Sequence, residues 1–350
     1  MKIPHSHLKE VSMKILEAIG AAETEVDVVS RSLLMADMRG IHTHGINFLP
    51  KVVSRVENGV MQIPTELEII SDEGAATHID GHNGFGQVAA EQGMRHAIEH
   101  GKKYGVGLSL IRNTNHIGLL AFYSLMAAEE GMIGLVMTNS APCMAPWGGA
   151  EPFFGTNPFS VAAPSGEDYP IILDMSTSLV ARGKIRRAVR LNKEIPEDWA
   201  LDAEGKKTTD PVKALEGTLL PMGGPKGYGM AFFIDLISGL LSGSRFSRDI
   251  LTFHKPLGPT GVGTMLMAID IEHFMDMKTF TGLVKDHAGS IRSSKKAEGT
   301  DRIFLPGEIE LEAERRSLRD GVEIDEPTVK ELNTILEKYD IALRMDGADN

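Results

Sequence analysis

The stretch that most constrains the fold lies between residues 106 and 137. An apolar run over 106–111 leads into a polar loop, a helical pattern follows over 119–130, and a second apolar run occupies 132–137. This order is typical of two parallel strands joined by a crossover helix. Because ligands in such sheets bind beyond the carboxyl ends of the strands, we expect the loop after the first strand to face a functional site.

His116 lies in that loop, just before the predicted helix. The positive end of a helix dipole disfavours protonation of a nearby imidazole, so His116 would stay neutral and be available as a base. A neutral imidazole near pH 7 can take a proton from an alcohol, or return one to a ketone. The alternative is a histidine that only caps the helix, and position alone does not separate the two.

Two further polar stretches are candidates for binding a ligand. Asp174 follows a predicted strand over 171–173, where it could hold a ribose hydroxyl or cap the next helix. Lys226 and Gly227 lie in a glycine-rich turn whose free backbone N–H groups could bind an anion, although tight packing of a helix on a sheet explains the same glycines. The usual dinucleotide fingerprint is absent, because the segment over 81–86 does not match it.

Composition excludes several classes of function. The 350 residues have a formal net charge of −12, which argues against a surface for nucleic acid or anionic membranes, because such surfaces need clustered Lys and Arg. The single cysteine, Cys143, excludes an internal disulfide and indicates a reducing compartment. Cys143 could be a nucleophile or a small apolar filler. Without an apolar leader or a long apolar run, we expect a cytoplasmic protein with no membrane span.

Helical periodicity dominates the first sixty residues, with helices predicted over 8–19, 24–40 and 48–58. His44 lies in the connection before the third helix, where polar groups can face a site. It could be a second acid, a ligand to a substrate carboxylate, or one of a metal-binding pair with His42. No further cluster of Cys, His and carboxylate completes a zinc set, so we expect no metal, and a metal-dependent hydrolase or lyase remains the rival interpretation.

Several short motifs occur in order along nearly the whole chain. They are Ala36-Asp37-Met38-Arg39-Gly40 with Thr43-His44-Gly45, Asn115-His116-Ile117-Gly118, Gly148-Gly149-Ala150-Glu151 with Phe154-Gly155-Thr156-Asn157-Pro158, Asp174-Met175-Ser176-Thr177, Ala181-Arg182-Gly183-Lys184-Ile185, Thr209-Asp210-Pro211, Gly224-Pro225-Lys226-Gly227-Tyr228-Gly229 and Pro306-Gly307-Glu308. Together they resemble the malate/L-lactate dehydrogenase family of NAD(P)-dependent oxidoreductases, which includes ureidoglycolate dehydrogenase, diketogulonate reductase and sulfolactate dehydrogenase.

The resemblance implies an α/β fold with a mixed-sheet cofactor domain that differs from the Rossmann fold, as in sulfolactate dehydrogenase. It predicts a helical domain from residues 1–70 plus 310–350 and a cofactor- and substrate-binding domain over 71–309. It also implies a homodimer. Because the family's cofactor site uses scattered loops, the missing fingerprint is no objection.

The resemblance also implies roles for particular residues. His116 and His44 both fall on proton-transfer positions of the family, and we favour His116 as the main acid or base because of its place in the loop. NAD is the expected cofactor, with NADP possible. The cofactor-contacting positions are Ser140, Asp174, Met175, Ser176, Lys226, Gly227, Pro306, Gly307 and Glu308.

Two departures from the family pattern concern the substrate. Thr43 stands where family members often have serine, and the hydroxyl is retained. Phe48 stands where many have an arginine that clamps the substrate carboxylate in a bidentate pair, and phenylalanine cannot do so. Either another cation replaces it, with Arg182 and Lys184 as candidates, or the substrate is not a simple dicarboxylate.

The sequence therefore predicts an NAD(P)-dependent 2-hydroxyacid dehydrogenase. The expected reaction passes a hydride between the nicotinamide and a small acid of the malate, lactate, ureidoglycolate or sulfolactate type. A physiological reductase of keto acids or cyclic imino acids is the alternative within the same class.

Overall fold

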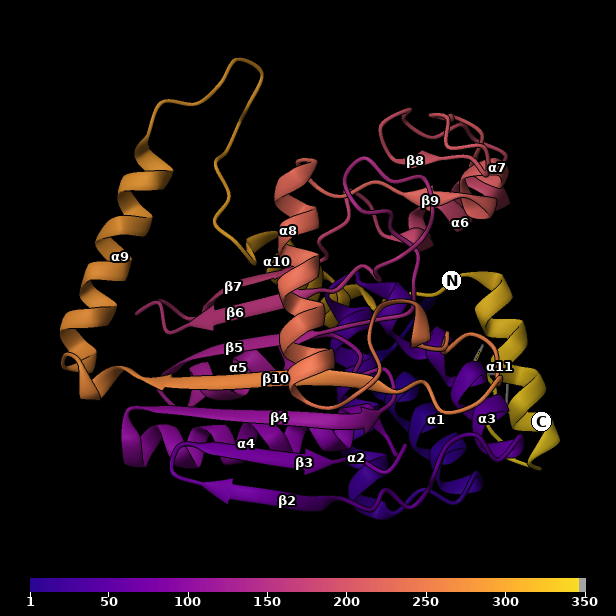
Figure 1. The fold of residues 1–350 in the computed structure, drawn as a ribbon, viewed down its shortest axis with the longest axis horizontal. Coiled ribbons are helices and arrows are strands. Elements are labelled where there is room, and N and C mark those ends of the chain that lie inside the picture. Colours follow the sequence, from indigo (N-terminus) through magenta and orange to yellow (C-terminus); the bar gives the residue numbers. More distant parts are fainter. Residues whose placement is uncertain (346–350) are drawn as a thin grey trace.

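A seven-stranded mixed sheet forms the centre of the molecule (Figure 1). The computed structural model describes residues 1–345. The strand order is β2-β3-β4-β10-β5-β6-β7, in which only β3 and β4 pair in parallel. In chain order the strands are β2 Glu68–Glu73, β3 Ala76–Asp80, β4 Val106–Thr114, β5 Met132–Thr138, β6 Phe159–Ala163, β7 Ile171–Met175 and β10 Val262–Asp270.

The predicted strand–helix–strand unit is present, but its two strands are not neighbours. β4 and β5 flank helix α5 (Ala121–Glu129) in the chain and point the same way, yet β10 lies between them and pairs antiparallel with both. The two strands are therefore parallel, as predicted, although they do not pair with each other. The physical reason is that β10, which is almost wholly buried, supplies the apolar central strand from a distant part of the chain.

Helices cover the two faces of the sheet unequally (Figure 1). Helix α4 (Gly86–Tyr104) and α5 cover one face, and alternate residues of β4, β5 and β6 are buried beneath them. On the other face lies α8 (Pro225–Asp235), continued by a π-helical turn η3 (Leu236–Leu241), while α9 (Met277–Ser293) stands apart from the sheet. The residues of β4, β5 and β6 that point to this face are only half-buried or exposed.

The two ends of the chain pack together at one end of the sheet. Helices α1 (His5–Ala18), α2 (Glu23–Met38), α3 (Leu49–Glu57) and α11 (Glu326–Lys338) share one hydrophobic core. The short strands β1 (Lys2–Ile3) and β11 (Val322–Glu323) pair antiparallel beside them. The three predicted amino-terminal helices are thus confirmed in place.

The remaining elements form a small lobe and short connections. The lobe has its own apolar core. In the described part of the chain, residues 1–345, every helix is too short or too polar to cross a membrane. The elements of the lobe are α6 Arg182–Arg190, β8 Ala200–Leu201, α7 Pro211–Glu216 and β9 Thr218–Leu219. Elsewhere, α10 is Glu308–Asp320, and the 3-10 turns are η1 His42–His44, η2 Ile46–Phe48, η4 Ser247–Asp249 and η5 Ile271–His273.

A tight contact between α4 and β4 leads to a test of this packing. A Cβ atom on Gly107 of β4 would lie 2.0 Å from the carbonyl oxygen of Ala97 in α4. We expect Gly107→Ala to lower the free energy of unfolding by about 1–3 kcal/mol, because the helix must move off the sheet. Urea denaturation followed by circular dichroism measures the change.

Gly282 provides the matched control. It lies inside α9, where an added Cβ meets no atom within 4 Å. Gly282→Ala should raise the free energy of unfolding by about 0.5–1 kcal/mol, because alanine restricts the unfolded chain. Equal effects of the two substitutions would contradict the layer arrangement.

Candidate active site

Two histidines from different parts of the chain meet beyond the end of β4. His116 follows β4, and His44 ends the 3-10 turn η1 between α2 and α3. Their ring centroids are 5.2 Å apart, and both side chains are half-buried. The structure therefore brings together the two residues that the sequence nominated for proton transfer.

An aromatic wall lies against this histidine pair. The ring of Phe48 is 4.4 Å from that of His116, and the ring of Phe253 lies 4.9 Å from Phe48 and 6.1 Å from His116. The fully buried guanidinium of Arg55 stacks on Phe253 and donates to the carbonyl of Gly258 at 2.7 Å, which fixes the loop that bears Phe253. Apolar rings beside the imidazoles keep water away from them and favour their neutral forms.

A backbone hydrogen bond sets the tautomer of His116. The N–H of Gly118 donates to Nδ1 of His116 at 2.9 Å, so in the neutral ring the proton is assigned to Nε2. Burial, and then the neighbouring His44 and His254, lower the pKa of His116 well below its usual value. A second proton on Nδ1 would also oppose the Gly118 N–H. His116 is therefore held as a neutral hydrogen-bond donor.

The helix dipole is not what keeps His116 neutral, contrary to the sequence-based argument. The amino end of α5 begins at Ala121, and its N–H donates to the carboxylate of Asp174 at 2.7 Å. That carboxylate offsets the positive end of the helix. The helix-capping alternative for His116 is likewise wrong, because Asp174 binds the free N–H of α5.

His44 has a different environment. Its Nδ1 lies 2.8 Å from the hydroxyl of Thr43, which can either donate to the neutral nitrogen or accept from a protonated one. Burial lowers the pKa of His44 to about 4, so the ring is neutral at pH 7. Because Thr43 accommodates both states, His44 can gain and lose a proton without breaking its hydrogen bond.

His42 does not pair with His44. Its Nδ1 lies 2.9 Å from the buried carboxylate of Asp37, which also accepts the N–H of Ile46 at 2.6 Å. Gly45 permits this approach, because a Cβ there would overlap the Asp37 carboxyl at 2.1 Å. Within residues 1–345 no group of three His, Cys, Asp or Glu side chains is arranged to hold a metal ion.

Most residues expected to contact the cofactor lie along β7, with Asp174 to Ser176 at its end and Pro306 to Glu308 beside its beginning. Asp174, Met175 and Ser176 form and follow its last residues. The carbonyl of Pro306 accepts the N–H of Ile172 in β7 at 3.3 Å, which holds Gly307 against this strand. Ser140 packs on Gly155, and the next residue, Thr156, accepts the N–H of Thr177 at 2.8 Å.

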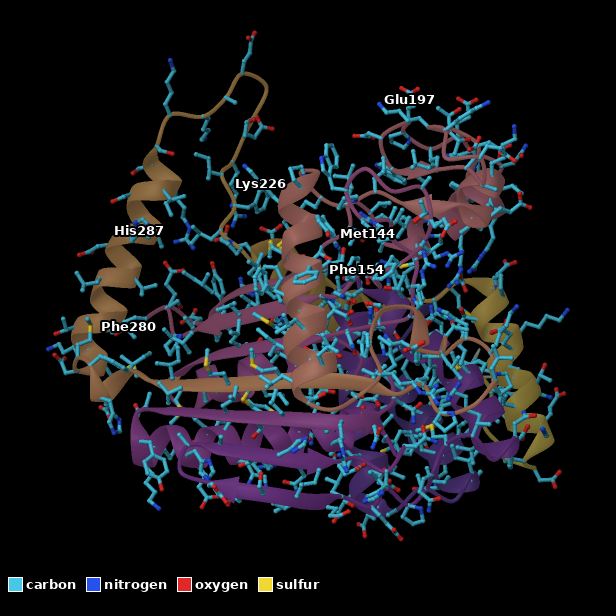
Figure 2. All side chains as sticks on the ribbon, in the orientation of Figure 1. Met144, Phe154, Glu197, Lys226, Phe280 and His287 are labelled. Atoms are coloured by element: carbon cyan, nitrogen blue, oxygen red, sulfur yellow. The ribbon has the colours of Figure 1, made fainter. Side chains whose placement is uncertain are left out.

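Lys226 and Gly227 lie within the first turn of α8 rather than in a flexible loop. The N–H groups of Lys226 and Gly227 bond to the carbonyls of Gly223 and Met222, so the expected cradle of free N–H groups was wrong. Gly227 serves packing, because a Cβ there would lie 2.6 Å from the carbonyl oxygen of Thr177. Lys226 itself is exposed at the upper end of α8 (Figure 2), where its ammonium can still meet an anion.

Glu308 is already held by protein groups. Its buried carboxylate accepts hydrogen bonds from Tyr169 and Arg292, each at 2.7 Å, and from the N–H of Leu305 at 2.9 Å. Burial opposes its ionisation, but these donors outweigh burial and lower the pKa of Glu308 to about 2. These hydrogen bonds of Glu308 anchor the start of α10 to the chain beside β7.

The donor set around β7 fits a nicotinamide dinucleotide. Asp174 can accept a ribose hydroxyl in addition to the Ala121 N–H, because each carboxylate oxygen accepts more than one hydrogen bond. Ser140 and Ser176 offer hydroxyls, and the ammonium of Lys226 suits a pyrophosphate. The segment from His116 to Ala121, which Asp174 fixes, links this group to the histidine pair.

The substrate candidates on α6 differ in their surroundings. A Cβ on Gly183 would lie 2.5 Å from Cγ2 of Thr43, so the first turn of α6 packs directly against the histidine turn. The guanidinium of Arg182 donates to the carbonyl of Leu215 at 2.7 Å and joins α6 to α7. Lys184 is exposed. The structure therefore brings Thr43 and Phe48 to the histidines, while Arg182 is partly engaged elsewhere.

The sequence did not indicate His254 or Lys51 as site residues, and it offered Arg186 only within the basic stretch over 184–190. His254 lies 6.2 Å from Phe48, and its Nε2 is 3.2 Å from Nη1 of Arg186, which neighbours Lys51. No local signal marks them, because 68 positions separate Arg186 from His254. Cys143 is buried, and burial raises the pKa of its thiol to about 11, which excludes a reactive thiolate at neutral pH.

Comparison with known proteins identifies the family. The sequence profile described as Malate/L-lactate dehydrogenase matches residues 3–333. The chain belongs to this family. It is 36% identical to a malate dehydrogenase of Pyrococcus abyssi, over 97% of this chain and 96% of that protein. It is 38% identical to the L-sulfolactate dehydrogenase of Methanocaldococcus jannaschii, over 93% and 94% of the two chains.

Solved structures give the same result for the fold. The sulfolactate dehydrogenase of Methanocaldococcus jannaschii matches with a TM-score of 0.92 at 36% identity, covering 99% of both chains. The malate dehydrogenase of Entamoeba histolytica matches with a TM-score of 0.94 at 33% identity, covering 98% of this chain and 99% of that one. These matches confirm the predicted mixed α/β fold and the predicted NAD(P)-dependent oxidoreductase of 2-hydroxy acids. They give no support to the metal-dependent hydrolase or lyase.

The low pKa of His44 leads to a prediction about stability and pH. Its folded pKa is about 4 and its ordinary value is 6.5, so the unfolded chain binds this proton first as the pH falls. The stability that the neutral ring provides is fully present above pH 6.5 and is lost between pH 6.5 and 4. Lowering the pH from 7 to 5 should therefore destabilise the wild type more than His44→Gln, in urea denaturation at each pH.

His287 provides the control for this measurement. It is exposed on α9, far along a helix that stands apart from the site (Figure 2). His287→Gln should show the same pH dependence of stability as the wild type. If His44→Gln also matched the wild type, His44 would not be held neutral by its surroundings.

Proposed function

We propose that this protein interconverts a small 2-hydroxy acid and its 2-keto acid, of the malate, lactate, ureidoglycolate or sulfolactate type. The observation that supports this most directly is the His44–His116 pair, 5.2 Å apart and joined to the end of β7 through Asp174 and Ala121. The residues along β7 would hold NAD, or NADP in the alternative, which would supply hydride transfer at the alpha carbon. His44 and His116 bind the substrate oxygen and provide for transfer of the hydroxyl proton.

We infer that His44 exchanges the proton. The Thr43 hydroxyl occupies the Nδ1 side of His44, which leaves Nε2 to face the substrate oxygen. In the oxidation direction, neutral His44 takes the hydroxyl proton on Nε2, and in reduction it returns that proton to the ketone oxygen. When the Nδ1–H of neutral His44 donates to the Thr43 hydroxyl, Nε2 keeps a free lone pair and can accept the proton.

His116 takes the complementary part. Its Nδ1 accepts the Gly118 N–H, so its Nε2 bears a proton and has no lone pair to offer as a base. As a donor, Nε2–H can hydrogen-bond the same substrate oxygen and stabilise negative charge that develops there. This reverses the preference for His116 as the main acid or base, because the sequence did not reveal the Gly118 hydrogen bond.

A nicotinamide absorbance assay tests this proposal. NADH and NADPH are run against a panel of 2-keto acids and a cyclic imino acid, with the reverse oxidations alongside. We expect turnover with at least one 2-keto acid, and comparison of the two directions distinguishes a dehydrogenase from a physiological reductase. A folded protein that bound neither nicotinamide would contradict the proposed function.

The same assay separates the two histidines. His44→Gln should lower kcat about 10²- to 10⁴-fold, because proton exchange is lost. His116→Gln should lower kcat less, because the glutamine amide keeps an N–H donor. Full turnover by His44→Gln together with an inactive His116→Gln would reverse the assignment.

We also propose that the protein is a homodimer, as the family resemblance implies. The sheet face beside α8 and α9 is the support for it. Apart from Arg112, the half-buried residues of β4, β5 and β6 on this face are apolar, and the helices beside it expose Phe233, Leu240, Leu241 and Leu283. An exposed apolar surface of this kind typically marks an interface, and a second copy of the chain would cover it.

A reducing, cytoplasmic location stays a prediction, supported by the single buried cysteine.

Sedimentation equilibrium tests the dimer. The wild-type mass should be twice that of the chain, and Phe233→Glu should shift the protein towards the monomer, because burying a carboxylate without a partner is costly. Val212→Glu is the control, because Val212 is equally apolar and exposed but lies on α7 in the small lobe. A monomeric wild type would overturn the proposal.

A further inference from the structure

The anionic group of a 2-hydroxy acid needs a cation near the histidine pair, and Phe48 cannot provide it. Four cationic side chains approach this region from α3 and α6. Arg190 is paired with Asp325 at 3.2 Å, and Arg182 donates to the carbonyl of Leu215. Lys51 donates to the carbonyl of Asn47. Within residues 1–345 Arg186 forms no ion pair and its guanidinium contacts the neutral ring of His254, so it is the cation best placed to meet an anion.

We propose that Arg186, oriented by His254 and supported by Lys51, binds the carboxylate of the substrate. This assignment rests on the proposed function and deepens it, because it names the residue that replaces an arginine at the position of Phe48. It differs from the sequence-based candidates Arg182 and Lys184.

A chain of contacts leads from Arg186 to the histidine pair. Nη1 of Arg186 lies 3.2 Å from Nε2 of His254, the ring of His254 is 6.2 Å from Phe48, and Phe48 is 4.4 Å from His116. Arg186 and His254 therefore lie on the side of the site that Phe48 borders. A guanidinium has five N–H donors, so the bond to His254 leaves donors free for a bidentate contact with a carboxylate.

His254 orients the guanidinium by remaining neutral. Burial, followed by the charges of Arg186 and Lys51, lowers the pKa of His254 to about 4. The neutral Nε2 can then accept the Arg186 N–H at pH 7. An oriented guanidinium loses less rotational freedom when a carboxylate binds, which favours recognition at this position.

The local charge balance favours an anion at this place. Burial is the first cause that lowers the pKa of Arg186 and that of Lys51. Nearby cations lower both further: Arg182 and Arg190 act on Arg186, and Arg186 and Arg190 act on Lys51. Like charges that are partly removed from water are unfavourable until an opposite charge compensates them. The carboxylate of the substrate would supply that charge.

Calorimetric titration of oxalate into the full-length protein saturated with NADH tests the proposal. Oxalate presents the carboxylate geometry of a 2-keto acid and does not react. We expect Arg186→Gln to bind oxalate about 10- to 100-fold more weakly, because a charge-assisted bidentate contact is lost. Arg186→Lys should bind with intermediate affinity, because lysine keeps the charge without the planar fork.

Arg187 provides the matched control on the same helix. It is exposed, and Arg187→Gln should bind oxalate as the wild type does. NADH affinity, measured separately by fluorescence, should be equal in all four proteins. Oxalate binding by Arg186→Gln within twofold of the wild type would overturn the proposal, and if that variant did not fold, wild-type affinity in Arg186→Lys would overturn it.

The same titration, repeated without NADH, separates this proposal from the proposed function. If wild-type protein bound oxalate in an Arg186-dependent way but bound neither nicotinamide, the carboxylate site would stand and the dehydrogenase proposal would fall. If it bound NADH and turned over a keto acid but Arg186→Gln bound oxalate unchanged, only the Arg186 assignment would fall.

Discussion

The position of the catalytic loop depends on the side-chain amide of Asn115. This residue is fully buried, and its Nδ2 donates to the carbonyl of Asn83 at 2.8 Å and to that of Gly84 at 2.9 Å. Its Oδ1 accepts from the hydroxyl of Thr260 at 3.0 Å. A buried amide must satisfy these groups, so the chain can leave β4 in only one way.

Asp174 fixes the other end of the same loop by binding the N–H of Ala121. His116 is thus held between two polar anchors, the buried Asn115 on the side of β4 and the half-buried Asp174 at the end of β7. The same carboxylate that anchors the loop is the strongest candidate for a ribose hydroxyl. Asp174 therefore sets the distance between the cofactor side of the site and the histidine side. Burial at this position raises the pKa of Asp174 to about 6.

The electrostatic character of the site follows from what surrounds it. Apolar rings from Phe48 and Phe253 border the imidazoles, which keeps His116 and His44 neutral. Beyond Phe48 lie Lys51 and Arg186, which form no ion pair within residues 1–345. A neutral proton-exchanging centre beside a positive anchoring group suits a substrate with a hydroxyl at one carbon and a carboxylate at the next.

Much of this could be predicted from the sequence where the signal is local. The helices near the amino terminus, β4, α5 and β5 follow from periodicity, and the family resemblance nominated both His44 and His116 for proton transfer. The insertion of β10 between β4 and β5 could not be predicted, because strand order depends on distant packing rather than on local pattern. The contact between Arg186 and His254 could not be predicted for the same reason. Nor could the Gly118 hydrogen bond that sets the tautomer of His116, because it depends on the exact path of the loop.

The central claim is that His116 acts as a fixed neutral donor while His44 exchanges the proton. The most direct measurement is nitrogen NMR of the protein with ¹⁵N-labelled imidazoles, with the His116 signals assigned by their loss in His116→Gln. We expect His116 to bear its proton on Nε2 and to remain neutral between pH 8 and pH 5. A proton on Nδ1 of His116, or conversion to imidazolium within that range, would contradict the assignment.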